Sequence, residues 1–385
     1  MIARQMKVLH VIPAVSPEYG GPSHALVPMC TSLRARGVEV QIAGTDATPH
    51  GHLPFELGKP TEFQGVPAIF FRKEASESFK YSPGLARWLH KHVATFDVVH
   101  IHGFFSHACW SAATACTRVG VPYVIRPLGN LEQWSLSQKA FKKKLFLRFG
   151  GHSLLKGAAA LHYVCAREKE LSETALKLNH GVIIPIGIRP PERISNGAGQ
   201  LPYVLVLSRL HPSKGIDVLL KAFLSLREGR AFADWRLVIA GDGVAGYKAD
   251  LRRIVNSAGL SDSVLFPGWL EGERKAEALA QASLMALPSH HEPFGICLLE
   301  AFAQGVPVLA GTEVGLADEI KAAGAGWISP VNVEALSNTL RQALSDSRER
   351  GRRGDAGRAL ARKFDLEIMA EMLSDLYNSI CAGRK

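Results

Sequence analysis

The chain has 385 residues, a length that favours two domains over one. Its composition, 47% hydrophobic and 21% charged, is that of an ordinary soluble globular protein. The 45 Lys and Arg residues outnumber the 35 Asp and Glu residues, and the formal net charge of +10 favours an anionic partner: nucleic acid, an acidic membrane surface or a phosphorylated substrate.

The six cysteines are scattered, and no pair has C-x2-C spacing. They are therefore predicted to be reduced core residues of a cytosolic protein rather than a disulfide framework or a zinc site. The apolar run within residues 1–13 is too short for a signal peptide, and no later run approaches 18 apolar residues. We expect a cytoplasmic protein that neither spans a membrane nor is exported by a cleaved signal.

The N-terminal half alternates short apolar runs with helical patterns, which is typical of a doubly wound parallel sheet. Strands are predicted at 7–12, 38–43, 68–72, 97–102, 122–126, 161–164 and 182–185, and helices at 23–36, 83–94, 106–119, 140–156 and after 166. The Pro-, His- and Gly-rich residues 46–65 are predicted to form a loop.

Residues 187–200 are rich in Pro and Gly and predict a domain linker. A second alternation follows it. Strands are predicted at 203–208, 235–240, 264–266, 283–287 and 305–310, with helices from 215 and at 296–304, and an amphipathic helix at 365–380. The sequence thus predicts two Rossmann-like α/β domains of similar size: 1–190, joined by the C-terminal helix at about 365–385, and 200–364.

The stretch 287–311 carries two carboxylates, Glu292 at the predicted helix start and Glu300 two turns inside. At a rise of ~1.5 Å per residue they lie roughly 12 Å apart, too far for an acid/base pair acting on one bond. The spacing suits the two hydroxyl-rich ends of a nucleotide-diphosphate sugar, with an anion held between them by the N–H groups of the helix start. Alternatively, Glu300 and Gln304 simply form the polar stripe of a helix.

Residues 292–301, EPFGICLLEA, resemble the E-x7-E signature of retaining glycosyltransferases of family 4. The resemblance implies the GT-B fold: two Rossmann-like domains facing across a cleft, with a C-terminal helix that returns to the N-terminal domain. It further implies that the N-terminal domain binds the acceptor and the C-terminal domain binds the nucleotide-sugar donor.

Two cations, Arg209 and Lys214, flank a turn after the strand 203–208, where they could converge on a diphosphate. The alternative is a pair of solvated loop residues. They resemble the family's R-x4-K pair, which neutralises the departing nucleotide diphosphate. The resemblance also implies that Glu292 orients the sugar hydroxyls and that Glu300 binds the ribose. The backbone N–H groups of Phe294, Gly295 and Ile296 would hold sugar and phosphate.

Residues 241–246 form a literal G-x-G-x-x-G after a strand, but the following strand ends without the carboxylate that a dinucleotide site needs. Gly241 is therefore predicted to line the nucleotide cleft. The resemblance implies that Trp269 and Leu270 contact the nucleobase through their backbone. It also implies that Gly20 and Gly21 lie against the donor phosphate, although a simple turn before a helix is the alternative.

His100 and His102 end a strand on the same face, but no third ligand is apparent nearby, so no metal site is predicted. His102 matches the second histidine of the family's H-x-H pattern, which approaches the transferred sugar. Many members follow it with an acidic residue, where this chain has Gly103. Arg126 and Asn130, which also follow a strand end, are candidates on the acceptor side of the same rim.

Residues 139–149 combine five basic residues with Phe141, Leu145, Phe146 and Phe149. This pattern fits an interfacial helix resting on an anionic membrane surface. A solvated basic face with an ordinary core stripe is the alternative. Nucleic acid is ranked last, because no recognition motif accompanies the charge.

The resemblance therefore implies a retaining, metal-independent hexosyltransferase that uses a nucleotide sugar and no cofactor. We expect UDP-glucose as the donor, with GDP-mannose second, and a saccharide or lipid-linked saccharide acceptor of cell-surface polysaccharide synthesis. The resemblance implies front-face attack assisted by the leaving phosphate. The alternatives are a sugar-nucleotide epimerase of the same fold and a non-catalytic nucleotide-binding protein.

Overall fold

The computed structural model describes residues 5–189, 201–227 and 232–383. The chain divides into two compact units: the first comprises the residues up to Gly187 together with those from Leu366 onwards, and the second runs from Ile188 to Asp365. Of the predicted linker 187–200, residues 190–200 lie outside the described residues. Each unit is a Rossmann-like α/β domain, as the sequence predicts.

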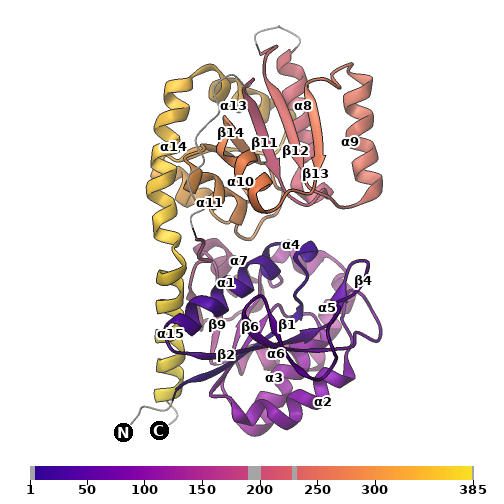
Figure 1. Cartoon of the computed structure of the whole chain (residues 1–385), viewed down its shortest axis with the longest axis vertical. Coiled ribbons are helices and arrows are strands. Elements are labelled where there is room, and N and C mark those ends of the chain that lie inside the picture. Colours follow the sequence, from indigo (N-terminus) through magenta and orange to yellow (C-terminus); the bar gives the residue numbers. More distant parts are fainter. Residues whose placement is uncertain (1–4, 190–200, 228–231, 384–385) are drawn as a thin grey trace. The chain divides into compact units, whose positions relative to one another are not determined.

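Unit 1 is built on a sheet in the order β10-β9-β8-β7-β1-β2-β6-β5 (Figure 1). Its neighbouring strands pair in parallel, except that β5 runs antiparallel to β6. The strands are β1 Lys7–Ala14, β2 Glu39–Thr45, β5 Pro60–Phe63, β6 Val66–Phe71, β7 Val98–His102, β8 Tyr123–Arg126, β9 Ala160–Tyr163 and β10 Gly181–Ile183, with a separate hairpin of β3 Ala47–Thr48 and β4 Gly51–His52.

Helices cover both faces of this sheet, because strands buried on both sides need an apolar layer on each. Helices α1 and α15 pack together over one face, and α2, α3 and α6 cover the other. The helices of unit 1 are α1 Gly21–Ala35, α2 Pro83–His92, α3 His107–Val119, α4 Gln133–Ser137, α5 Ala140–Phe146, α6 His152–Lys156, α7 Ala166–Leu176 and α15 Leu366–Ala382.

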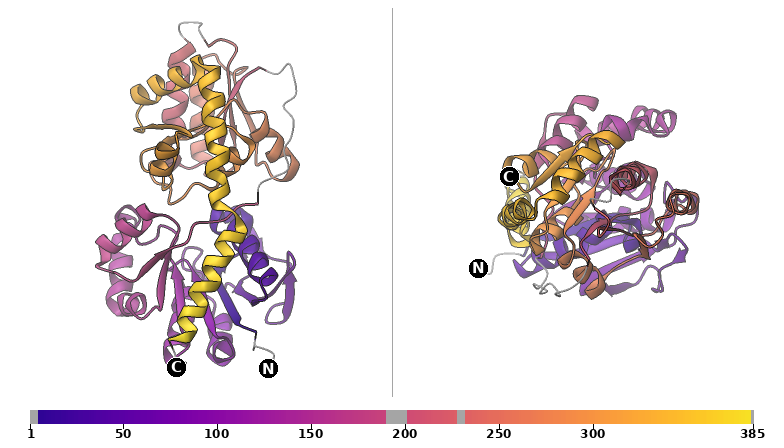
Figure 2. Two further views of the ribbon diagram at one scale, coloured as in Figure 1. Left: turned by 90° about the vertical axis from the view of Figure 1, so that its left-hand side faces the viewer. Right: turned by 90° about the horizontal axis from the view of Figure 1, so that it is seen from above.

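Unit 2 is built on a parallel sheet in the order β13-β12-β11-β14-β15-β16. Figure 2 shows its helices on the two sides of the sheet; α8 packs against α13, and α11 against α14. The elements are β11 Tyr203–Leu207, α8 Ile216–Arg227, β12 Arg236–Ala240, α9 Ala245–Ser257, β13 Val264–Gly268, α10 Gly272–Ala280, β14 Leu284–Leu287, α11 Ile296–Gln304, β15 Val308–Gly311, α12 Ala317–Ala323, β16 Gly326–Ser329, α13 Val333–Ser345 and α14 Ser347–Ala361.

Two sequence-based expectations for unit 1 are wrong. Residues 46–65 are not only loop, since they contain β3, β4 and β5; Phe63 of β5 is buried and packs edge-on against Phe70. The predicted helix 140–156 is interrupted by a π-helical turn, Leu147–Gly151. The interruption lies at Gly150, whose φ of +124° is a conformation that glycine adopts most readily.

No helix in the described part of the chain is both long and apolar enough to cross a membrane. All six cysteines lie in the described ranges and none forms a disulfide, as the sequence predicts. Four of them are buried, while Cys297 and Cys381 are partly buried.

Candidate active site

The candidate residues of unit 2 follow the carboxyl ends of four neighbouring strands. Trp269 comes directly after β13, Gly241 after β12, Arg209 shortly after β11 and Glu292 shortly after β14. Because the strands are parallel, these ends meet at one edge of the sheet, where α/β sheets commonly bind ligands. The Gly241 N–H donates to the carbonyl of Gly268 at 2.8 Å, which joins two of the four ends.

Lys214 and Glu292, 78 positions apart in the sequence, form an ion pair at this edge. The Lys214 Nζ atom lies 2.5 Å from Glu292 Oε2, and the two side chains are 12% and 18% exposed. Arg209 is exposed. The pKa of the intervening His211 lies below its ordinary value, first because of partial burial and then because of the positive charges of Arg209 and Lys214. The positive charges of both predicted phosphate-binding residues therefore reach His211, in the turn between them.

Helix α11 begins without a side chain that caps it. Its N-cap is Gly295, at φ +94°, and no side-chain hydrogen bond is made by that residue to the helix start. The first N–H groups of a helix have no partner within the helix, and they favour a bound anion. The Phe294 side chain points into the core, packing edge-on against Phe364 at 5.9 Å between ring centroids. Phe294 and Ile296 are thus placed to offer backbone groups at the helix start.

The second carboxylate of the signature is also paired. Lys275 on α10, which the sequence analysis did not single out, donates from Nζ to Glu300 Oε1 at 2.6 Å. Cys297 lies one turn before Glu300, and all four charged groups affect the pKa of its thiol. The pKa of its thiol is raised to about 12, mainly by burial; the charges of Glu292 and Glu300 contribute to this increase, and those of Lys214 and Lys275 oppose it. Each carboxylate of the E-x7-E stretch is therefore paired with a lysine from another segment, and all four charges act on Cys297.

The first residue of the glycine-rich segment 241–246 must be glycine, because the backbone of Ser208 lies very close to it. Gly241 has φ +147°, and a Cβ atom there would lie 1.9 Å from the Ser208 carbonyl oxygen. Beside it, the Leu210 N–H donates to the Asp242 carbonyl at 2.9 Å, and the Val244 N–H donates to the Leu210 carbonyl at 3.0 Å. The loops after β11 and β12 thus pair with each other, which accounts for the glycine without a dinucleotide.

The predicted nucleobase contacts lie at the next strand end. Trp269 is 37% exposed, and its indole N–H points to Glu271 Oε2 at 3.4 Å. Leu270 is partly buried. Both residues follow Gly268, whose φ is +81°. Their backbone is accordingly at the same sheet edge as Gly241.

In unit 1, Gly20 and Gly21 lie where the chain passes from β1 into α1. Gly20, at φ +96°, is the N-cap of the helix, and Gly21 is its first residue. The Ser23 N–H donates to the Gly20 carbonyl at 3.1 Å. Beside this turn, the buried Lys80 donates from Nζ to the Tyr19 hydroxyl at 2.8 Å. The sequence analysis did not identify that lysine.

His10 of β1 lies beside His100 and His102 and is a third histidine, which the sequence analysis did not associate with them. One ligand atom from each of His10, His100 and His102 lies within 4.8 Å of the others, so these rings could hold a metal ion. The expectation that no third ligand lies nearby is therefore wrong. Both nitrogens of His100 are already engaged, with the Tyr377 hydroxyl at 2.6 Å and with His162 Nδ1 at 3.2 Å. A metal would have to displace one of these partners.

Arg126 is not on a rim, contrary to the expectation, because its side chain is completely buried. No residue that the structure describes forms a hydrogen bond with its three guanidinium nitrogens. Burial lowers the pKa of Arg126 to about 10, and the nearby Glu168 carboxylate opposes that change. Burial, followed by the charge of Arg126, lowers the pKa of His10 to about 3.

Asn130 is partly buried, and its side-chain N–H donates to the Leu128 carbonyl at 3.3 Å. The glycine that replaces an acidic residue after His102 has a conformational reason: Gly103 has φ +92°, and its N–H donates to the Arg126 carbonyl at 2.8 Å. A side chain at that position would be strained.

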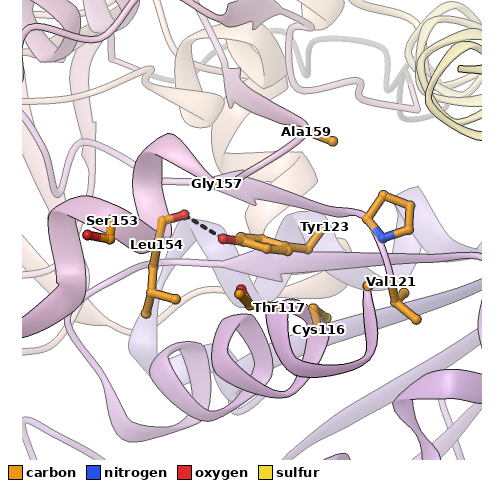
Figure 3. Close-up of a pocket in the computed structure, with 10 residues that line it drawn as sticks. Cys116, Thr117, Val121, Tyr123, Ser153, Leu154, Gly157 and Ala159 are labelled. Carbon is orange, nitrogen blue, oxygen red and sulfur yellow. Dashed lines mark hydrogen bonds between the residues drawn. The ribbon is translucent and has the colours of Figure 1, made fainter. Parts of the chain in front are cut away.

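One pocket of about 330 Å³ lies elsewhere in unit 1, beside the amino end of β8 (Figure 3). Its lining includes Cys116, Thr117, Val121 and Tyr123, and the Tyr123 hydroxyl donates to the Leu154 carbonyl at 2.7 Å. None of the predicted site residues lines it.

Comparison with known proteins accounts for almost the whole chain. The model of the glycosyl transferase 4-like domain matches residues 20–187, and that of the glycosyl transferases group 1 matches residues 189–360. The chain is 36% identical over 186 residues to the GDP-mannose-dependent monoacylated alpha-(1-6)-phosphatidylinositol monomannoside mannosyltransferase of Corynebacterium glutamicum, an alignment covering 46% of this chain and 47% of that protein. The first curated relatives are thus matched over about half of their own length.

Other similarities extend over the full length. The D-inositol 3-phosphate glycosyltransferase of Xylanimonas cellulosilytica is 26% identical over 414 residues, covering 97% of this chain and 95% of that protein. The crystal structure of the Anabaena protein HepE in complex with UDP and glucose superposes with a TM-score of 0.77 at 19% identity, covering 97% of this chain and all of that one, which shows a common fold. The chain therefore belongs to the family-4-like glycosyltransferases and has their GT-B fold.

Proposed function

We propose that this protein transfers a hexose from a nucleotide sugar to a hydroxyl group of a saccharide or lipid-linked saccharide acceptor, with retention at the anomeric carbon. The observation that carries the proposal is the arrangement at one sheet edge of unit 2: Arg209 and Lys214, the uncapped start of α11, and Glu292 and Glu300. Cations and helix N–H groups suit a diphosphate, and carboxylates suit hydroxyl groups.

The chemical roles follow from these charges. Arg209 and Lys214 would stabilise the charge that develops on the departing diphosphate, a role that a metal ion fills in other enzymes. Glu292 would orient hydroxyl groups of the sugar, Glu300 would bind the ribose, and His102 of unit 1 would approach the transferred sugar. Attack from the front face, assisted by the leaving phosphate, gives retention without an enzyme nucleophile.

The ion pairs of Lys214 with Glu292 and of Lys275 with Glu300 would change when a nucleotide sugar binds. Lys214 must exchange part of its bond to Glu292 for the diphosphate, and Lys275 must yield part of Glu300 to the ribose. Binding of the nucleotide would therefore weaken both ion pairs and leave Glu292 and Glu300 able to accept hydrogen bonds from hydroxyl groups of the sugar and the ribose. This exchange couples recognition of the phosphate to recognition of the sugar.

UDP-glucose is the proposed donor, and GDP-mannose is the second candidate. The names of three matched relatives specify GDP-mannose, which supports testing that donor beside UDP-glucose. A thermal-shift series with UDP, GDP, ADP and their sugars tests the choice. A ligand at about 100 times its Kd stabilises a protein by about 2.7 kcal/mol, which raises the Tm measurably.

We expect one nucleotide to raise the Tm, equally with and without EDTA, because the diphosphate is held by Arg209, Lys214 and helix N–H groups. Loss of the shift in EDTA would contradict the metal-independent site. No shift with any nucleotide would favour a non-catalytic role. Conversion of the nucleotide sugar without an acceptor would identify an epimerase.

An anionic membrane surface is the proposed partner of residues 139–149 in polysaccharide synthesis. Phe141, Leu145 and Phe149, spaced four residues apart, are 79%, 44% and 70% exposed. The structure changes the composition of the predicted surface. Phe146 packs into the core, edge-on to Phe104 at 5.3 Å, and Lys143 donates to the Ser135 carbonyl at 2.6 Å, so neither belongs to the exposed face.

Reversing the charges of Lys142, Lys144 and Arg148 to Glu is expected to weaken binding to phosphatidylglycerol-containing vesicles at least tenfold, since each basic residue near such a surface contributes about 1 kcal/mol. Vesicle sedimentation measures the change. The control variant, with Lys91, Lys221 and Lys321 changed to Glu, alters the net charge equally at exposed positions outside this segment. Equal binding by both variants would contradict the proposed surface.

A further inference from the structure

Four buried histidines and Arg126 lie on one face of the unit 1 sheet. Residues opposite each other in neighbouring parallel strands share a face, and His10 of β1 pairs with His100 of β7, while His102 pairs with Arg126 of β8. His162 of β9 joins them through His100. Helix α15 covers this face.

The donor of each hydrogen bond between His162, His100 and Tyr377 can be assigned, starting from the bond between His162 and the Ile184 carbonyl. His162 Nε2 lies 2.7 Å from the Ile184 carbonyl oxygen, which only accepts, so His162 carries its proton there. Burial lowers the pKa of His162 to about 3, which keeps the ring neutral and leaves a lone pair on Nδ1. That lone pair, 3.2 Å from His100 Nε2, accepts the His100 proton.

The same logic extends to helix α15. With its proton on Nε2, the neutral His100 ring has a lone pair on Nδ1, 2.6 Å from the Tyr377 hydroxyl. Burial raises the pKa of Tyr377, so its hydroxyl remains protonated and donates. The chain of donors therefore runs from Tyr377 through His100 and His162 to Ile184, and it fixes the position of the His100 ring.

His102 is held by two neighbouring rings. Its Nε2 atom lies 3.0 Å from His10 Nδ1, and its ring stacks on His100 with 4.5 Å between centroids and 22° between planes. Its remaining nitrogen, Nδ1, has no hydrogen-bond partner among the residues that the structure describes. His102 is the last residue of β7, at the carboxyl end of the sheet where α/β proteins bind ligands, and in this structure its Nδ1 atom is buried.

We propose that His10 and Tyr377 are positioning residues for His102: His10 acts by its hydrogen bond, and Tyr377 acts through the stacked His100 ring. The inference rests on the proposed role of His102 at the transferred sugar. The C-terminal helix α15, which carries Tyr377, would then help to hold His102 in position. Neither His10 nor Tyr377 would touch the ligand, so their effect is on orientation rather than on chemistry.

Tyr377→Phe removes a single buried hydroxyl group of α15 and keeps the aromatic ring in the core between that helix and the sheet. Tyr163→Phe is the matched control, since Tyr163 is also buried but none of the described residues forms a hydrogen bond with its hydroxyl. In protein labelled with ¹⁵N at histidine, Tyr377→Phe is expected to shift the ring nitrogens of His100 and His102, and Tyr163→Phe is expected to leave those of His102 unchanged. The kcat of Tyr377→Phe should fall about tenfold with little change in the donor KM.

His10 provides a second, independent test. His10→Asn places an amide group close to the position of Nδ1 and can still bond to His102, whereas His10→Leu cannot. We expect His10→Asn to retain at least a third of the kcat and His10→Leu to lose about tenfold or more.

Unchanged His102 ring signals together with a kcat within twofold of wild type in both Tyr377→Phe and His10→Leu would overturn the inference. If the wild-type protein transfers no sugar, the proposed function fails, and the ¹⁵N signals of His102 still decide whether His10 and Tyr377 position it.

Discussion

Lys214→Ala is expected to lower kcat by about 10²–10³-fold, the usual effect of removing one group that stabilises developing negative charge. The reason is electrostatic, because in the proposed reaction the departing diphosphate would gain charge as its bond to the sugar breaks. Lys214 is the less exposed of the two cations at the sheet edge. Turnover with a nucleotide sugar and acceptor at saturating concentrations measures the effect.

The variant also leaves Glu292 without its ion-pair partner, and that charge is only 18% exposed. A loss of activity could therefore reflect a disturbed site rather than the missing cation. The double variant Lys214→Ala with Glu292→Gln removes the uncompensated charge. We expect the double variant to recover the Tm of wild type and to remain inactive.

Lys248 provides the matched control for Lys214. It is a lysine of the same unit that forms an ion pair with Asp242 at 2.6 Å, but its side chain is 36% exposed. Lys248→Ala should keep kcat within about twofold, because exposed ion pairs contribute little. Near-normal turnover of Lys214→Ala, or an equal loss in both variants, would contradict the assignment of Lys214 to the diphosphate.

Gly241→Ala is expected to lower the stability of unit 2 by about 3 kcal/mol or more, and its Tm by about 10 °C. The added Cβ atom would lie 1.9 Å from the Ser208 carbonyl oxygen, and φ +147° is a conformation that alanine rarely adopts. The paired loops after β11 and β12 would have to separate. Calorimetry and urea titration measure the loss.

Gly246→Ala is the control within the same G-x-G-x-x-G segment. Gly246 lies inside α9, and no neighbouring atom lies within 4 Å of the position of a Cβ atom. Alanine is the better helix former, so this variant should be as stable as wild type or more stable by up to about 1 kcal/mol. Equal destabilisation by both substitutions would show that the close approach at Gly241 is not what requires glycine.

The contrast between Gly241 and Gly246 also shows the limit of a motif. The spacing of these glycines resembles a dinucleotide fingerprint, yet the geometry gives the first a role in loop pairing and the last an ordinary helical position. Only the missing carboxylate after the next strand argued against the dinucleotide from sequence alone. A glycine pattern becomes informative when the atoms that surround each position are known.

Local patterns in the sequence were sufficient to predict the fold of each half and the elements that carry the site. Buried parallel strands are continuous apolar runs, and a helix such as 296–304 is limited by Gly295 and Gly305, which have positive φ. These signals depend on neighbours within a few positions along the chain. The same reasoning located Arg209 and Lys214 in the turn after a strand, Glu292 before a helix and Glu300 inside that helix.

Only the tertiary structure decided which side chains meet. Lys275 joins Glu300 across 25 positions, and His10 joins His102 across 92, since strand order and helix packing bring them together. Burial follows the same rule, because Arg126 looks like a rim residue at a strand end until α1 and α15 cover its face of the sheet. Periodicity is a property of one segment, whereas a contact or a desolvated charge is a property of several segments at once.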